Sequence, residues 1–146
     1  MLVRPDGTEF ASGRSRFLDY SPGSRERTPK IFVKIQPESV DGVIFAQLDT
    51  GAAWSMLNAE IAETLSLLGR QGEPVEMSTR LGKFNGHLER TSLAIVADDG
   101  ESVSVEATVW VSGEWPGGTF LGYGGLLERI RFAVDPSDNS FYFGPI

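Results

Sequence analysis

Residues 45–52 of this 146-residue chain read Phe-Ala-Gln-Leu-Asp-Thr-Gly-Ala. The apolar residues before Asp49 predict a strand that ends at this carboxylate, where low dielectric and backbone donors tune its protonation. Gly51 lets the chain turn sharply beneath the carboxylate, and the Thr50 hydroxyl is able to hold the turn by hydrogen bonding. The simpler interpretation is an ordinary turn, because Asp, Thr and Gly are all common in turns.

The segments around residues 45–52 predict short strands with only brief helices. The expected strands are residues 30–35, 42–48, 74–81, 88–96, 103–111, 130–134 and 140–143. Asn58 is the candidate N-cap of a short amphipathic helix that ends near Gly69, and a second helical stretch is expected at residues 126–130. No long helix separates consecutive strands, so the pattern favours an all-β barrel or sandwich over βαβ units.

Residues 1–29 are rich in Gly, Ser, Arg and Pro, and their apolar residues are too scattered to define one face. We therefore expect a loosely ordered N-terminal arm over residues 1–29. Residues 30–146 are expected to form one domain, because the chain is long enough for a single core and contains no internal repeat.

The composition disfavours several classes of partner. There are 13 Lys and Arg against 20 Asp and Glu, and the net charge of -7 argues against nucleic acid and anionic membranes as partners. The absence of cysteine removes disulfides and thiolate metal ligands. No apolar run approaches the roughly 20 residues that span a bilayer, and the polar start lacks a secretory signal, so a cytoplasmic location is the default expectation.

A second motif gives residues 45–52 a more specific meaning than a turn. Phe120-Leu121-Gly122 stands later in the chain, directly before the expected helical stretch at residues 126–130. Two motifs in this order resemble the retropepsin family of single-domain aspartic proteases. In that family Asp-Thr-Gly-Ala closes one strand, and a hydrophobic pair followed by Gly threads behind the catalytic loop. The resemblance covers about residues 31–143.

The resemblance implies a small closed acid-protease β-barrel with one or two short helices. It also implies a homodimer that hydrolyses polypeptides with water activated between two Asp49 carboxylates, without a cofactor or metal. Thr50 and Gly51 carry over as supports of the catalytic loop, with Thr50 bonding across the dimer. The residues expected to bind substrate are Ala52, Ala53, Trp54, Leu81, Gly82, Phe84, Gly86 and Leu121.

Residues 80–87 stand where the family places its flap, a β-hairpin that covers the substrate. Asn85-Gly86 is a suitable pair for a tight turn, and Phe84 is a candidate cap for an apolar subsite. An ordinary exposed hairpin is the alternative, since only position argues for a lid. His87, the only histidine, is expected to be a polar strand residue and not a general base.

Two residues near the motifs depart from the retroviral pattern. Ala53 and Tyr123 replace an acidic residue and an arginine that form an ion pair in retroviral members, and losing both leaves no unpaired buried charge.

The aromatics at residues 141–143 are too many for one face of a strand. We expect them to contact a second chain, as terminal strands do in the family, and the alternative is that residues 1–29 cover them.

Two other functions remain open on the sequence. The first is a dimeric retropepsin-like module that binds or scaffolds without catalysis, because one fold hosts several functions. The second is a phosphoryl-transfer enzyme with an aspartyl nucleophile. That hypothesis predicts alternating strands and helices and a second acidic residue at position 51, where the chain has Gly.

Overall fold

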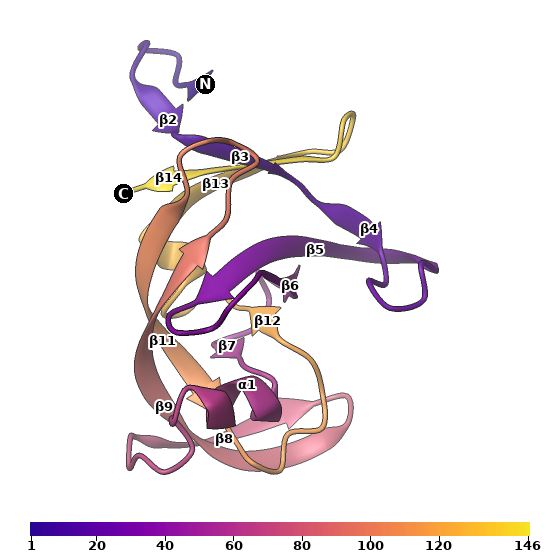
Figure 1. The fold of residues 1–146 in the computed structure, drawn as a ribbon, viewed down its shortest axis with the longest axis vertical. Coiled ribbons are helices and arrows are strands. Elements are labelled where there is room, and N and C mark those ends of the chain that lie inside the picture. Colours follow the sequence, from indigo (N-terminus) through magenta and orange to yellow (C-terminus); the bar gives the residue numbers. More distant parts are fainter.

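The computed structural model describes all 146 residues, and nearly half of them lie in two β-sheets (Figure 1). The strands of the larger sheet are, in spatial order, β4 (Leu18–Tyr20), β5 (Arg27–Pro37), β6 (Ile44–Leu48), β12 (Phe120–Leu121), β7 (Ser55–Met56), β11 (Val103–Val111), β9 (Gly82–Ile95) and β8 (Pro74–Thr79). The smaller sheet has the order β10 (Asp99–Gly100), β3 (Gly13–Arg16), β14 (Ser140–Pro145) and β13 (Ile130–Asp135). β1 (Leu2–Val3) and β2 (Glu9–Ala11) form a separate pair.

The larger sheet closes on itself through one extra pairing. β5 also pairs with β9, with Ile35 opposite Ile95, so β5, β6, β12, β7, β11 and β9 are linked in a ring. Along β11 the apolar residues at alternate positions 103, 105, 107 and 109 are buried, while Ser104 and Glu106 are exposed. Period-two alternation therefore places one face of this strand in the main core. The mostly β fold with short helices that the sequence predicts is confirmed.

The helices are short and have clear ends. The α-helix α1 (Ala59–Thr64) begins at Asn58, whose side chain accepts hydrogen bonds from the backbone N–H groups of Glu60 and Ile61, as expected for an N-cap. It ends five residues before Gly69, because Ser66 adopts a left-handed conformation with φ 59° that a helix cannot continue. The other helix is one 3-10 turn, η1 (Leu127–Arg129). Neither helix is long and apolar enough to cross a bilayer.

The N-terminal segment is more ordered than the sequence predicts. β3 pairs with β14, with Gly13 opposite Phe143, and Ala11, Ser15 and Phe17 are buried. The expectation of a loosely ordered arm is therefore wrong for these strands. Every second residue from Ala11 to Phe17 faces inward. Of these four residues only Phe17 is large, so hydrophobicity alone does not reveal the alternation. Small residues are required here, because a Cβ at Gly13 would lie 2.5 Å from the Phe143 ring.

The C-terminal aromatics pack inside their own chain. Phe141 and Phe143 are fully buried, with ring centroids 5.6 Å apart. β3 and β13 occupy the two edges of β14, so no edge of this strand is left for a strand of a second chain. The expected contact of residues 141–143 with another chain is therefore wrong for both phenylalanines. The alternative, coverage by the N-terminal segment, is what the structure shows.

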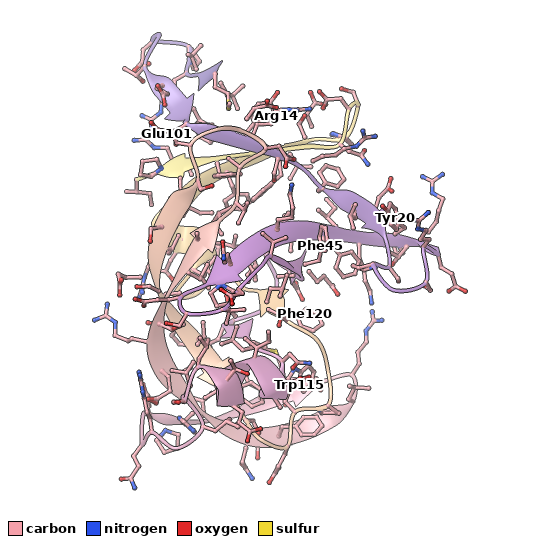
Figure 2. The ribbon with its side chains drawn as sticks, in the orientation of Figure 1. Arg14, Tyr20, Phe45, Glu101, Trp115 and Phe120 are labelled. Carbon is pink, nitrogen blue, oxygen red and sulfur yellow. The ribbon has the colours of Figure 1, made fainter.

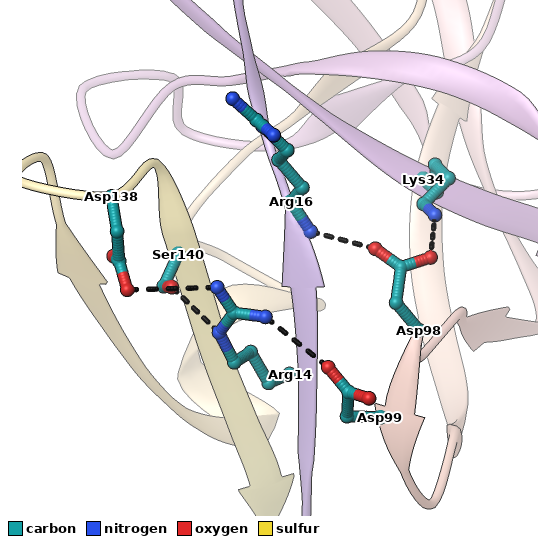
Figure 3. A network of polar contacts seen from close by, with 7 residues as sticks. All are labelled: Arg14, Arg16, Lys34, Asp98, Asp99, Asp138 and Ser140. Carbon is teal, nitrogen blue, oxygen red and sulfur yellow. Dashed lines mark hydrogen bonds and ion pairs between the residues drawn. The ribbon is translucent and has the colours of Figure 1, made fainter.

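Polar contacts of Arg14 join β3 to its neighbours in the smaller sheet (Figure 3). Arg14 donates from Nε to the Ser140 hydroxyl at 2.6 Å and forms ion pairs with Asp99 and Asp138 at 3.2 and 3.6 Å. These pairs are partly exposed, so each contributes little alone. The network fixes the position of β3 relative to its neighbours.

Asp98 links β3 to the larger sheet. Its carboxylate accepts from the Arg16 backbone N–H at 2.8 Å and pairs with the Lys34 ammonium. Burial by itself would raise the pKa of Asp98, but the hydrogen bond and charge of Lys34, with the Arg16 N–H, outweigh it and hold the pKa below its usual value.

Candidate active site

The two motifs that the sequence singles out are adjacent in the structure. β6 and β12 pair in parallel, with Leu48 opposite Leu121, and the Asp49 backbone N–H donates to the Leu121 carbonyl at 2.9 Å. Asp49 therefore begins its loop where β6 ends, held from behind by the second motif. Leu121 itself is fully buried in the main core. Its side chain has no surface to offer a substrate, and its carbonyl positions the loop.

The Asp49 loop is a tight turn with its carboxylate half-exposed. The Gly51 N–H donates to Asp49 Oδ1 at 3.0 Å, and the Ala52 N–H donates to the Asp49 carbonyl at 3.2 Å. Thr50 and Gly51 are exposed. None of the five ion pairs in the chain involves Asp49. The carboxylate is thus oriented by a backbone donor and left available to groups outside the chain.

Gly122 allows the second loop to cross directly behind the first. Its N–H donates to the buried Ser55 hydroxyl at 2.8 Å, and a Cβ at this position would lie 2.4 Å from the carbonyl of Trp54. No side chain fits without moving backbone. The crossing explains why a glycine must follow the hydrophobic pair.

Backbone hydrogen bonds join the two loops beyond the crossing. The N–H groups of Tyr123 and Gly124 donate to the carbonyls of Ala52 and Ala53, each at 2.9 Å. These bonds hold together the loop positions where the retroviral pattern has an ion pair. The Tyr123 side chain is 55% exposed, and Ala53 is also exposed. Ala52 and Ala53 therefore lie next to the Asp49 turn, and Trp54 follows them in the chain.

The hairpin expected near residues 80–87 exists, but its turn lies elsewhere. β8 and β9 pair from Pro74 opposite His87 to Thr79 opposite Gly82, so Arg80 and Leu81 form the tip. Gly82 has φ 120°, a value that glycine adopts readily. Leu81 is 61% exposed. Leu81 and Gly82 are thus the residues of the predicted set that lie at the free end of the hairpin.

The prediction that Asn85-Gly86 makes the turn is wrong. Both residues lie inside β9, opposite Glu76 and Val75. Gly86 is small for a packing reason, because a Cβ there would lie 2.5 Å from the Trp110 ring and 2.4 Å from the Val111 carbonyl. The sequence alone does not distinguish a glycine that leaves room for a tryptophan ring from a glycine that makes a turn.

An aromatic cluster packs against the β8–β9 hairpin. Trp115 makes edge-on contacts with Phe84, Trp110 and Phe120, with ring centroids 5.4, 6.2 and 6.3 Å apart. Trp54 packs against the same cluster, which is separate from the main core. Figure 2 shows Trp115 and Phe120 on the same side of the molecule. Phe84 therefore packs into the body of the chain. The positions of Trp110 and Trp115 are not predictable from the sequence, since nothing in their local pattern indicates a cluster.

Two hydrogen bonds fix the base of the hairpin to the body. Trp110 Nε1 donates to the Val75 carbonyl at 2.8 Å, and the Ser112 hydroxyl donates to the Asn85 carbonyl at 2.6 Å. His87 lies in β9, as Asn85 does, and its Nδ1 is 3.0 Å from the buried carboxylate of Glu89. The hairpin is thus anchored at its base and exposed at its tip.

Comparison with solved structures identifies this architecture. A retropepsin-like aspartic protease from Rickettsia conorii matches with a TM-score of 0.59 and 20% identity, over 90% of this chain and 98% of that protein. The chain has the retropepsin-like fold. The retroviral protease-like domain of Ddi1 from Leishmania major also matches, with a TM-score of 0.46 and 16% identity, over 82% of this chain and 93% of that domain. No family model matches the sequence, and the search of curated proteins finds no relative.

Two hollows in the surface lie away from the Asp49 turn. Those hollows are lined by residues 36–40 and 64–67 and by neighbouring side chains of β9, and contain none of the candidate site residues. The Asp49 turn thus lies outside both hollows.

Proposed function

We propose that this protein is an aspartic endopeptidase that acts as a homodimer, with water activated between the Asp49 carboxylates of two chains. The observation that carries the proposal is the Asp49 turn, in which a half-exposed carboxylate accepts from the Gly51 N–H and has no ionic partner in its own chain. Its position against β12 in a retropepsin-like fold supports the same reading.

One chain supplies only half of the proposed site. The sequence has a single Asp-Thr-Gly, at residues 49–51, and no internal repeat that would bring a second one. Catalysis by a carboxylate pair therefore requires two chains that meet at this loop. The exposed Thr50 is then placed to bond across the dimer, and polypeptide substrate would lie between the loops and the tips of the two hairpins.

The proposed chemistry follows from placing two like charges together. Two carboxylates at close range do not both ionise, so the pair keeps one proton and titrates as a unit, as aspartic proteases in general do. The ionised Asp49 takes a proton from water, whose oxygen attacks the scissile carbonyl carbon. The protonated Asp49 donates to the carbonyl oxygen, which gives a tetrahedral diol. The C–N bond of the diol then breaks as the leaving nitrogen takes the proton that the other Asp49 received from water, and no covalent enzyme intermediate forms. The Gly51 N–H orients the carboxylate throughout.

A binding or scaffolding module without catalysis is the second candidate. It is favoured by Ala53 and Tyr123, since the exposed tyrosine replaces a charged contact near the substrate. This candidate predicts dimerisation and peptide binding with no cleavage at any pH.

The decisive experiment is incubation of the purified chain with a peptide library from acidic to neutral pH, with cleavage sites read by mass spectrometry. We expect cleavage that a pepstatin-type inhibitor blocks and that Asp49→Asn abolishes. Asp41→Asn is the matched control, because it removes the same charge from an exposed loop between β5 and β6. Cleavage that survives Asp49→Asn contradicts the proposal, and peptide binding without cleavage favours the scaffolding function.

A further inference from the structure

The β4–β5 hairpin extends past the sheet that holds Asp49. Phe32 is the first residue of β5 that pairs with β6, where it lies opposite Gln47, so residues 27–31 have no partner on that side. They belong to a two-stranded ribbon with β4. Asp49 follows Gln47 by two residues, and Lys30 precedes Phe32 by two, so the ribbon leaves the body beside the Asp49 loop. Figure 1 shows the hairpin pointing away from the body.

The hairpin is long and unsupported. From Phe32 to Arg27 the strand makes five residue steps, about 17 Å at roughly 3.3 Å each. Residues 22–27 at its end are all exposed, and the Arg27 side chain is 89% exposed. Two-stranded ribbons are marginally stable in water unless another surface packs against them. This ribbon is therefore expected to gain stability from a partner.

The charge of the hairpin is opposite to that of the body. Residues 18–31 of the hairpin contain Arg25, Arg27 and Lys30 against the acids Asp19 and Glu26, a net charge of +1. Residues 31–146 contain seven Lys and Arg against sixteen Asp and Glu, a net charge of -9. The one ion pair in the hairpin, Arg27 with Asp19 at 3.8 Å, is too exposed to neutralise it. The surface that complements this hairpin is acidic, and the body of the same protein is acidic.

We propose that the β4–β5 hairpin is a dimerisation arm that docks on the acidic body of a second copy of this chain. The inference rests on the proposed function, which brings a second chain against the Asp49 loop. A chain placed there meets the hairpin that leaves the body beside that loop. The C-terminal strand cannot supply an interleaved sheet, since both edges of β14 are occupied. The hairpin offers contact area and opposite charge in its place.

The test compares two sets of charge reversals. The arm variant is Arg25→Glu, Arg27→Glu and Lys30→Glu, and the control is Arg4→Glu, Arg70→Glu and Arg90→Glu, which changes the net charge equally at exposed positions elsewhere. Sedimentation gives the dimer dissociation constant at low and high salt. We expect the arm variant to weaken the dimer at least tenfold and the control less than threefold, with unfolding midpoints that match the wild type. Wild-type affinity should fall as salt rises.

A cross-linking experiment reads the contact directly. Because the chain has no cysteine, Ser24→Cys introduces a single thiol at the end of the hairpin that carries a photoreactive maleimide. We expect cross-links between chains, with the acidic body of the second copy as the target. Ser137→Cys, at the exposed turn after β13, is the control and should give few.

The outcomes separate the arm from the proposed function. A wild-type protein that dimerises and cleaves, with an arm variant that dimerises equally well or cross-links only within a chain, overturns the arm and leaves the protease standing. An arm variant that dimerises normally but loses cleavage of acidic peptides alone makes the hairpin a substrate contact and also overturns the arm. A wild-type chain that is monomeric and inactive overturns the proposed function.

Discussion

At the scale of single residues, Gly122 decides whether the two loops of the site can cross. A Cβ there would lie 2.4 Å from the Trp54 carbonyl and 2.8 Å from the Ser55 nitrogen, and both are backbone atoms. We expect Gly122→Ala to lower the free energy of unfolding by about 1–3 kcal/mol, the usual cost of overpacking. Urea denaturation measures this. The matched control is Gly118→Ala, where a Cβ meets nothing within 4 Å, and a change equal to that of Gly122→Ala would contradict the steric argument.

Asp98 makes the free energy of unfolding depend on pH in the acidic range. Its pKa is lowered in the folded chain by Lys34 and the Arg16 N–H, against the effect of burial. Folding thus favours the ionised form, so the stabilisation is present above the unfolded pKa of about 4 and is lost as pH falls through the lower folded value. The carboxylate is partly exposed, so we expect Asp98→Asn to cost only about 0.5–1 kcal/mol at neutral pH.

The measurement for Asp98 is urea unfolding of wild type and Asp98→Asn at several pH values. The difference between them should shrink toward zero as the pH falls below 4. Asp41→Asn, at an exposed loop position, should show no comparable difference at any pH. A gap between wild type and Asp98→Asn that stays constant down to the lowest pH would refute the assignment.

Residue roles differ in how far the sequence reveals them. The turn at Asp49 and the glycine at position 122 are predictable as structural features, because their motifs state both the residue types and the order. The sequence predicts substrate contacts for Leu121 and Phe84, yet Leu121 is buried in the main core and Phe84 packs on Trp115. Whether an apolar side chain faces inward or outward depends on tertiary packing, and Trp115 is 31 residues from Phe84 in the chain.

At the scale of elements, strands with large inward-facing residues were predictable and those with small ones were not. β11 (Val103–Val111) alternates apolar with polar residues from Val103 to Val109, and its predicted bounds match the structure. β3 (Gly13–Arg16) presents glycine and serine inward, so no hydrophobic alternation marks it. The local sequence does not show that Phe141 and Phe143 require small residues opposite them.

Removal of the N-terminal strands tests their structural role. Deletion of residues 1–17 removes β3 and uncovers Phe143, which is fully buried against it. We expect residues 18–146 to unfold without a cooperative transition and to bind a hydrophobic dye, because burial of a phenylalanine contributes about 1.5–3 kcal/mol. Thermal unfolding followed by circular dichroism measures this.

The matched deletion removes only residues 1–7. It takes away β1, which pairs only with β2. This shorter deletion should leave the unfolding transition almost unchanged. If residues 18–146 alone unfold with the wild-type midpoint, the N-terminal strands are dispensable and the sequence-based boundary at residue 30 describes the folding unit better.

At the scale of the whole molecule, a site shared by two chains has a consequence that no single-chain enzyme has. When wild-type chains exchange with excess Asp49→Asn chains, most wild-type chains enter mixed dimers with one carboxylate. The mixed site retains one carboxylate and an amide, so it lacks the pair that shares a proton. We expect a ninefold excess of Asp49→Asn to reduce cleavage by wild-type chains to about a tenth, since about one partner in ten is then active.

The control mixture contains the same excess of a chain that is expected to enter dimers more weakly. Asp49→Asn combined with Arg25→Glu, Arg27→Glu and Lys30→Glu serves, because the arm that we propose is reversed in it. This mixture should inhibit much less than Asp49→Asn alone at concentrations near the wild-type dissociation constant. Cleavage that is proportional to wild-type protein in both mixtures would show that each chain works alone. Equal inhibition by both would retain the shared site and place the dimer contact outside the β4–β5 hairpin.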